Sequence, residues 1–139
     1  MKILYIDTNI FLNVLFAEDK FADASMRLLN SIEEERYSAV TSLLTLMEIH
    51  RVLQKRRKRE LEIKNAIRNI LNLSLKVIVP ESADMVVAYQ LIKELRIDPA
   101  DSIHVALAKE VADIFISRDK YLVSKIKSVI TTKNPEELM

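Results

Sequence analysis

The sequence alternates short apolar, β-branched runs with longer segments of helical periodicity, and this alternation constrains the fold more than any other feature. Strands are predicted over residues 2–6, 37–41, 75–79, 113–117 and 128–131. Helices are predicted over residues 10–17, 19–35, 43–59, 60–73, 82–96 and 99–111. Strands separated by helices indicate an α/β fold in which a parallel sheet is covered by helices on both faces.

One connection needs a particular path through this fold. Two helices, 82–96 and 99–111, lie between strand 75–79 and strand 113–117. A simple up-and-down path would make the second of these strands antiparallel to the first. We therefore expect helix 82–96 to run across the edge of the sheet, so that the later strand returns in the parallel direction.

The composition excludes several kinds of site. The chain has 139 residues without any glycine or cysteine, and only two histidines, His50 and His104. Without glycine there is no Walker loop and no glycine-rich dinucleotide-binding turn. Without cysteine there is no disulfide, thiolate zinc site or cysteine nucleophile. The length is that of one domain, so we expect a single domain over residues 1–139.

The charges are nearly balanced, with 21 Lys and Arg against 20 Asp and Glu. A nucleic acid would therefore have to bind at a local patch of basic residues. The apolar first segment is interrupted by Asp7, Asn9 and Asn13, which argues against a signal peptide, and no apolar run is long enough to cross a membrane. We expect a cytoplasmic protein. The abundance of Ile, Leu, Lys and Glu, with only two glutamines, is typical of a thermophile.

Two aspartates follow predicted strands. Asp7 comes directly after strand 2–6, and Asp119 follows strand 113–117 after one intervening residue. In open parallel sheets, ligands bind at the carboxyl ends of the strands, where the strand order reverses. The two carboxylates therefore lie at one edge of the sheet if both strands are parallel. For either aspartate alone, a turn residue or a helix cap is the favoured interpretation.

Two further acids lie on predicted helices. Glu48 belongs to a helix that is apolar almost all round, and a carboxylate buried there is costly unless it is paired, for example with Arg51, or bound to a metal. Asp101 lies in the first turn of its helix, where the helix dipole favours an acid. Asp98, which caps the same helix, is a rival for any functional role. His104, one turn further along, is more typical of a core histidine than of a ligand.

The four carboxylates of Asp7, Glu48, Asp101 and Asp119 indicate a metal site. Acids that converge on one edge of a sheet repel one another and raise one another's pKa, so that without a cation they destabilise the fold. Oxygen ligands alone suit Mg²⁺ or Mn²⁺ better than zinc or copper. A pair of such ions is a common means of hydrolysing phosphodiesters, with no serine, cysteine or histidine nucleophile.

Four short motifs occur in the order and at the spacing of the PIN-domain family. They are an apolar–Asp–Thr–Asn–apolar start within residues 5–12, Glu48-Ile49, an Asp-x-apolar-x-x-Ala-x-Ala segment at residues 101–108, and Ser-x-Asp at residues 117–119. Each motif is weak alone, but together they extend over essentially the whole chain. The sequence therefore resembles PIN domains, and most closely the VapC-type toxin ribonucleases of prokaryotic toxin–antitoxin pairs.

The resemblance implies a three-layer PIN-like sandwich, in which a parallel sheet of about five strands lies between helices. It also implies a Mg²⁺- or Mn²⁺-dependent endoribonuclease that hydrolyses RNA phosphodiester bonds. The catalytic and metal-binding residues would be Asp7, Glu48, Asp101 and Asp119. The polar residues Thr8, Asn9 and Ser117 would hold these carboxylates or the scissile phosphate. The implied partners are an antitoxin that covers the metal site and a second copy of the chain in a homodimer.

A run of basic residues, 55–59, follows Glu48 along the same predicted helix. Five consecutive helical residues point all round the axis, so the run as a whole indicates a solvated helix end. Alternatively, the basic residues at four-residue spacing, Arg51, Lys55 and Arg59, line a path along which RNA reaches the acids.

Three other functions compete with a toxin ribonuclease. A PIN nuclease of RNA processing or quality control would use the same acids, whereas a catalytically silent PIN-like binding module would not need the intact set. A phosphoaspartate protein fits badly. A haloacid-dehalogenase-type phosphatase needs an acid where Asn9 stands, and a receiver domain needs an aspartate at the end of strand 75–79.

Overall fold

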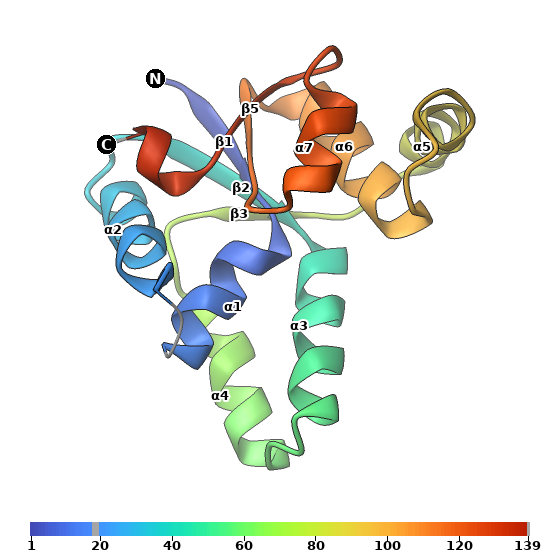
Figure 1. The fold of residues 1–139 in the computed structure, drawn as a ribbon. Coiled ribbons are helices and arrows are strands. Elements are labelled where there is room, and N and C mark those ends of the chain that lie inside the picture. The colour runs from blue at the N-terminus through green and yellow to red at the C-terminus, as the bar shows by residue number, and fades with distance from the viewer. Residues whose placement is uncertain (18–19, 139) are drawn as a thin grey trace.

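The computed structural model describes residues 1–17 and 20–138, and these residues form five strands, seven α-helices and one short 3₁₀ helix. The strands are β1 (Ile3–Ile6), β2 (Ser38–Ser42), β3 (Lys76–Ile78), β4 (Ile114–Ile116) and β5 (Thr131–Lys133). The helices are α1 (Thr8–Phe16), α2 (Ala22–Glu33), α3 (Leu43–Lys55), α4 (Glu60–Leu71), α5 (Ser82–Leu95), α6 (Pro99–Val111), α7 (Lys120–Ile126) and the 3₁₀ helix η1 (Pro135–Leu138). Figure 1 shows their arrangement.

All neighbouring strands pair in parallel, in the order β3-β2-β1-β4-β5. The predicted α/β fold with a parallel sheet is therefore confirmed. From β1 the chain builds outward to β3 on one side, and then adds β4 and β5 on the other side. The strand order thus reverses between β1 and β4, where Tyr5 pairs with Phe115. At such a position a parallel sheet opens a crevice at its carboxyl end.

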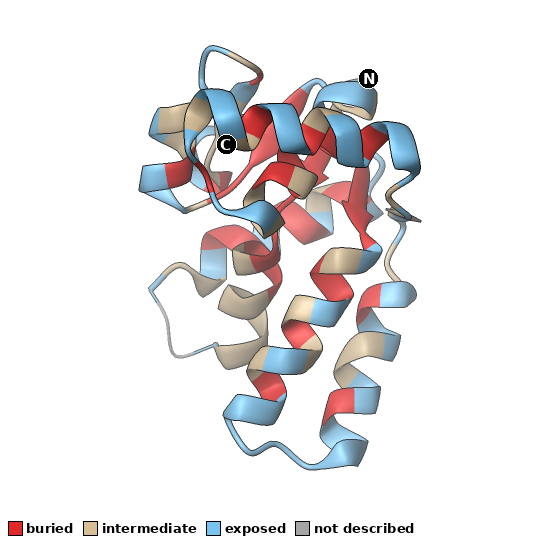
Figure 2. Ribbon diagram, turned by 90° about the vertical axis from the view of Figure 1, so that its right-hand side faces the viewer, coloured by how far each residue is buried: buried red, intermediate tan, exposed pale blue. Residues whose placement is uncertain are grey.

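Alternate residues of the central strands point into two separate cores. Leu4 and Ile6 of β1 lie in the core beneath α1–α4, whereas Tyr5 lies in the core beneath α5–α7. Full burial of each such large side chain contributes about 1.5–3 kcal/mol to stability. Figure 2 shows the buried central strands between helices that expose their outer sides. The result is the three-layer sandwich that the PIN resemblance implies.

Helices α5 and α6 form the two-helix connection between β3 and β4. They pack against each other, and Ala88 and Leu91 of α5 share a core with Val105 and Leu107 of α6. Figure 1 shows α5 nearly end-on at the side of the molecule. Because α5 does not run back along the sheet, β4 returns parallel to β1, as predicted.

The basic run after α3 is not helical to its end, and here the prediction is wrong. The predicted helix 43–59 stops at Lys55, because the chain takes left-handed backbone angles at Arg57 (φ 57°) and turns into α4. Arg59 stands at the start of α4. Arg51 and Arg59 therefore belong to different helices and do not form one stripe.

The C-terminal part of the chain differs from the prediction in two further places. The sequence pattern does not predict α7, which has only seven residues, or the short helix η1. The predicted strand 128–131 is mostly a turn, because the amides of Val129 and Ile130 bond back to the Ile126 carbonyl. The strand that follows, β5, is a polar edge strand without an apolar pattern.

The helix predicted over 19–35 is observed as α2 from Ala22, and its predicted start at residue 19 lies outside the described residues. Within the described ranges, no helix is both long and apolar enough to cross a membrane.

Candidate functional site

Asp7 ends β1 and begins α1, at the edge where the strand order reverses. Its Oδ1 accepts from the Thr8 amide (2.8 Å), and its Oδ2 accepts from the Ser117 hydroxyl (2.7 Å) and the Asn9 side chain (3.1 Å). Burial raises the pKa of the Asp7 carboxyl above its usual value, although the charge of His104 and the hydrogen bonds from Ser117 and Thr8 lower it. This carboxylate is therefore oriented by neutral donors.

Asp119 follows β4 and caps α7. Its Oδ1 accepts from the Leu122 amide (3.0 Å), and its own amide donates to the Ser117 hydroxyl (3.1 Å). Because Ser117 also donates to Asp7, one hydroxyl links the two aspartates that follow strands. Both aspartates are helix caps, as one interpretation of the sequence holds, and they also lie close together at one edge of the sheet.

Glu48 reaches the same edge from α3. Its Oε1 accepts from the Thr8 hydroxyl (2.7 Å) and lies 2.5 Å from Nε2 of His104. In the described part of the chain, its charged partner is His104 and not Arg51. Burial disfavours the charged carboxylate, but the hydrogen bonds from His104 and Thr8 and the charge of His104 bring the pKa of Glu48 below its usual value.

His104 connects Glu48 to the core. The imidazole is 1% exposed, and its Nδ1 lies 2.6 Å from the Tyr5 hydroxyl. Burial disfavours the imidazolium, yet the Glu48 hydrogen bond and the charges of Asp7 and Glu48 raise the pKa of His104. His104 is thus a core histidine, as its sequence position indicates. It also orients Glu48, which is a candidate metal ligand. The one sequence signal for this second role is its place one turn after Asp101.

Asp101 lies in the first turn of α6 and is half-buried. Burial, together with the charges of Asp7, Asp119 and Asp98, raises the pKa of Asp101 to about 6, whereas His104 lowers it. No described residue donates a hydrogen bond that would stabilise its charged form. The fold therefore brings Asp101 within electrostatic range of both aspartates that follow strands.

The oxygen donors at this edge suit Mg²⁺ or Mn²⁺, because they are carboxylates that crowd one another. They are not arranged as a ready-made cage: within residues 1–17 and 20–138, no three carboxylate or imidazole groups converge closely enough to hold a metal ion. Hydrogen bonds hold three of the four carboxylate oxygens of Asp7 and Glu48 in their present positions.

The three supporting polar residues all lie among the acids. Thr8 donates to Asp7 and Glu48, while Asn9 and Ser117 donate to Asp7. Asn9 is itself fixed, because its Oδ1 accepts from the Arg118 amide (3.1 Å). The structure thus places the predicted polar residues where they can orient the carboxylates.

Arg118 is a structural residue of the site that sequence reasoning misses. Its side chain is 9% exposed and donates to Asn13 (2.8 Å) and Glu136 (2.7 Å). Its guanidinium also lies over the Phe21 ring, 4.3 Å from the centroid. Arg118 therefore ties the loop after β4 to α1, α2 and η1. Its position between Ser117 and Asp119 is a variable one in the motif, so the pattern carries no signal for it.

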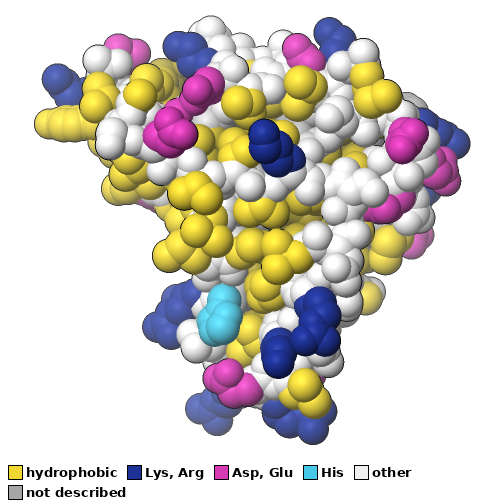
Figure 3. Space-filling model, turned by 180° about the vertical axis from the view of Figure 1, so that it is seen from behind, with side chains coloured by type: hydrophobic (Ala, Val, Ile, Leu, Met, Phe, Trp, Pro, Cys, Tyr) yellow, Lys and Arg dark blue, Asp and Glu magenta, His cyan; other side chains and the backbone are white. Residues whose placement is uncertain are grey.

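The predicted basic path is only partly assembled. Arg51 and Lys55 are exposed on α3, whereas Arg59 belongs to the next helix and donates to Glu62 (3.0 Å). Figure 3 shows Lys and Arg side chains at the lower tip of the molecule, where α3 and α4 meet in Figure 1. The basic run thus lies at the end of α3 that is far from the sheet.

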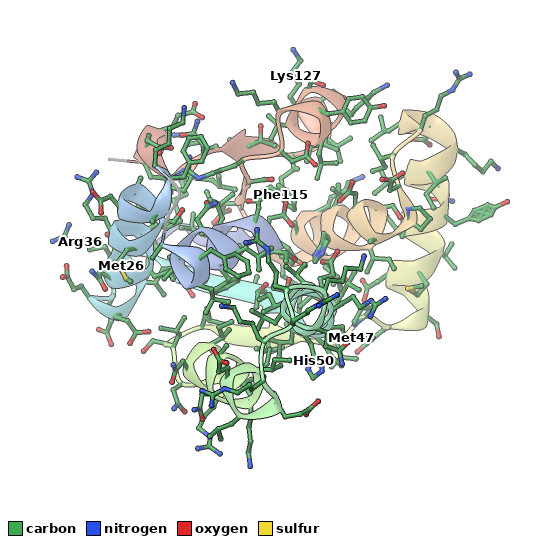
Figure 4. The ribbon with its side chains drawn as sticks, turned by 60° about the horizontal axis from the view of Figure 1, so that its bottom comes forward. Met26, Arg36, Met47, His50, Phe115 and Lys127 are labelled. Carbon is green, nitrogen blue, oxygen red and sulfur yellow. The ribbon has the colours of Figure 1, made fainter. Side chains whose placement is uncertain are left out.

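Helix α3 is not buried all round, contrary to the prediction from its composition. Leu46 and Ile49 face the core, but Leu43 and Met47 are 41% and 61% exposed. The reason is that α3 covers one face of the sheet, so its outer side meets solvent. Met47 and His50 project from this outer side in Figure 4, and Figure 3 shows a band of hydrophobic side chains on the same face.

Comparison with known proteins gives one family and a group of solved structures. The family model described as "PIN domain" matches residues 4–127. The structure resembles VapBC2 of Rickettsia felis bound to a promoter DNA fragment (TM-score 0.74, 18% identity, 95% of this chain and 98% of that chain). It also resembles VapC20 of Mycobacterium tuberculosis, described as a sarcin–ricin loop cleaving toxin (0.72, 18%, 87% and 93%), and VapBC-1 of nontypeable Haemophilus influenzae (0.72, 16%, 96% and 98%). At these identities the likeness establishes the fold. The curated proteins contain no match to the sequence.

Proposed function

The chain belongs to the PIN domain family, and from that premise we propose that it is a metal-dependent endoribonuclease that hydrolyses RNA phosphodiester bonds. The observation that carries the proposal is that four acids lie within electrostatic range of one another near the reversal point of the sheet. Asp7 and Asp119 come from strand ends, and Glu48 and Asp101 come from helices on opposite faces of the sheet.

The proposed mechanism assigns the same four carboxylates to one or two divalent cations. When bound, Mg²⁺ or Mn²⁺ supplies an activated water and neutralises charge on the scissile phosphate. Thr8, Asn9 and Ser117 hold the carboxylates in orientation by donating to them. His104 keeps the Glu48 carboxylate ionised and fixes its direction. Such outer partners typically change metal affinity or activity by about 10- to 100-fold when they are removed.

We also propose that the protein is the toxin of a toxin–antitoxin pair, with an antitoxin as its partner. The support is the fold shared with VapBC complexes over almost the whole of both chains. A nuclease of RNA processing would have the same acids, so a neighbouring antitoxin gene and a purified complex would decide between the two. A single domain over residues 1–139, a cytoplasmic location and a thermophilic source stay predictions.

A homodimer is part of this proposal. The outer sides of α3 and α5 expose large apolar side chains that a monomer would leave in water: Leu43, Met47, Met85, Val86 and Tyr89. Exposed apolar patches of this kind mark interaction surfaces. Sedimentation should show a dimer at micromolar concentrations, and a strict monomer at high micromolar concentration would contradict it.

The decisive experiment is cleavage of structured RNA by the purified protein, with Mg²⁺ or Mn²⁺ and then with EDTA. We expect Asp7→Asn to lose more than about 100-fold in rate and Ser117→Ala about 10- to 100-fold. Asp23→Asn is the matched control, because Asp23 is an exposed acid on α2. Cleavage that persists in EDTA, or an Asp7→Asn variant as active as Asp23→Asn, would contradict the mechanism.

A further inference from the structure

A basic cleft lies beside the acids, at the β5 edge of the sheet, between α7 and the segments at the start of α2 and in η1. It has a volume of about 680 Å³ and includes Ser117 in its lining. Five cations from separate segments line it: Lys20 before α2, Arg118 after β4, Lys120 and Lys127 at the two ends of α7, and Lys133 in β5. The acids in the lining are Glu136 and Glu137. Cations therefore outnumber acids in this cleft, although the chain as a whole is almost neutral.

Four of the five cations are available to a ligand. Arg118 is not available, because it forms an ion pair with Glu136 and donates hydrogen bonds to Asn13 and Ser25. Among the described residues, none of the four lysines forms an ion pair, and Lys20 contacts only the Phe21 ring (5.2 Å). Unpaired cations that line a concave surface raise the local concentration of a polyanion.

The cleft adjoins the acids at Ser117 and Lys120. Ser117 lines the cleft, and the same hydroxyl donates to Asp7 and accepts from the Asp119 amide. Lys120 directly follows Asp119 at the start of α7. A chain that occupied the cleft would therefore pass next to the carboxylates.

Building on the proposed function, we propose that this cleft binds the phosphate backbone of a single RNA strand on one side of the bond that is cleaved. Lysines are flexible point charges that suit repeated phosphates without selecting bases. The exposed face needed for base stacking is lacking at Phe21, because Arg118 and Lys20 lie over its ring. The cleft would thus increase the affinity for RNA and set the direction in which the strand runs past the acids, with little preference for its sequence.

An acidic protein segment is a different occupant, and the lining favours RNA over it. Peptides that dock in grooves rely on apolar anchors in buried pockets. The lining residues other than Phe21 and Val123 are polar or charged. A polyphosphate chain needs no such anchors, because its affinity comes from release of counterions.

The test measures equilibrium binding of a short fluorescent oligouridylate to the full-length protein in EDTA, over a range of salt concentrations. The cleft variant is Lys120→Ala/Lys127→Ala, since both side chains are exposed and their loss should not affect folding. The matched variant is Arg51→Ala/Lys55→Ala, which removes two exposed cations from α3. Figure 4 shows Lys127 on the opposite side of the molecule from His50, which marks α3.

We expect the cleft variant to bind about tenfold more weakly at low salt, with a slope of log K against log salt that is shallower by roughly 1.4, or about 0.7 for each lost phosphate contact. The α3 variant should keep the wild-type slope. An unchanged slope in the cleft variant, or a loss confined to the α3 variant, would overturn the proposal. If the melting temperature of Lys120→Ala/Lys127→Ala falls below that of the wild type, Lys20→Ala/Lys127→Ala is used as the cleft variant instead.

Two further outcomes separate this inference from its premise. If polyglutamate displaces the oligouridylate as well as unlabelled RNA does, the cleft is a site for acidic protein and the RNA assignment is wrong. Binding is measured without metal and without cleavage. If the protein never cleaves RNA but shows the slope change, the proposed nuclease activity is refuted and RNA binding by the cleft stands. If it cleaves RNA in a metal-dependent way but the slopes are unchanged, only the proposed RNA binding by the cleft is refuted.

Discussion

The acid cluster has two halves that are stabilised by different forces. In the half at the strand ends, Asp7 and Asp119 cap helices and share the Ser117 hydroxyl. In the half on the helices, Glu48 depends on the charge of buried His104, and at Asp101 burial and repulsion outweigh the attraction of His104. The first half is therefore fixed by helix caps and by the shared Ser117 hydroxyl, while the second half carries the electrostatic cost of the site.

The largest effect should come from removing the anchor of the strand-end half. Arg118→Ala should lower the free energy of unfolding by about 3 kcal/mol, because it removes several hydrogen bonds of a buried cation at once. Those bonds join Asn13, Ser25 and Glu136 to the loop that carries Asp119. Urea unfolding followed by circular dichroism measures the change.

Arg36→Ala is the control for this loss. Arg36 pairs with Glu34 on the surface, with side chains 69% and 56% exposed. Exposed pairs contribute about 0–1 kcal/mol, so this variant should unfold almost as the wild type does. Similar losses in both variants would mean that Arg118 is an ordinary surface arginine and that the loop is held in another way.

The strand-end half is also the part that the sequence predicts best. Buried strands such as β1 have apolar residues in an uninterrupted run, and the polar residue that ends the run marks the edge of the sheet. Asp7 ends the run of β1 in this way, and Ser117, two residues before Asp119, ends the run of β4. By contrast, β5 is polar and is defined by its pairing with β4, and α7 is too short for a helical period to stand out.

The helix half was less accessible to prediction for a physical reason. Glu48 and His104 are 56 positions apart and meet only because α3 and α6 are brought to the same edge of the sheet. Local spacing favours Arg51 as the partner of Glu48, since it lies three residues away on the same helix. The fold instead leaves Arg51 in water and places the imidazole against the carboxylate.

The second prediction concerns His104, which carries the charge of the helix half. His104→Ala should destabilise the protein by about 2 kcal/mol, because it removes the hydrogen bond between the buried Tyr5 hydroxyl and the imidazole and leaves the Glu48 carboxylate without a counter-charge. His104→Gln, which restores an amide donor, should recover part of the loss. Thermal unfolding in EDTA measures both variants.

His50→Ala is the matched control, since His50 is a half-exposed histidine on the outer side of α3. It should change stability by less than about 0.5 kcal/mol. If the two alanine variants unfold at the same temperature, the His104–Glu48 pair contributes nothing and the comparison between the two halves fails.

The smallest effect has the opposite sign and tests the comparison most directly. Asp101→Asn should raise the stability of the metal-free protein by about 1 kcal/mol, because it removes a charge that is desolvated and repelled by Asp7 and Asp119. Asp119→Ala should lower stability by about 1 kcal/mol, because it removes a helix cap. Mn²⁺ should stabilise the wild type more than either variant, since a ligand of the folded state shifts unfolding by mass action.

The pH dependence follows from the same carboxyl group. The pKa of Asp101 is about 6 in the folded chain and near 3.8 when unfolded, so folding favours its protonated form. This contribution to stability is fully present below pH 3.8 and is lost as the pH rises through 6. In EDTA, the stability difference between Asp101→Asn and the wild type should therefore widen between pH 5 and pH 7. A difference that stays constant over this range would mean that Asp101 carries no repulsion from the strand-end aspartates, and that the acids do not form one cluster.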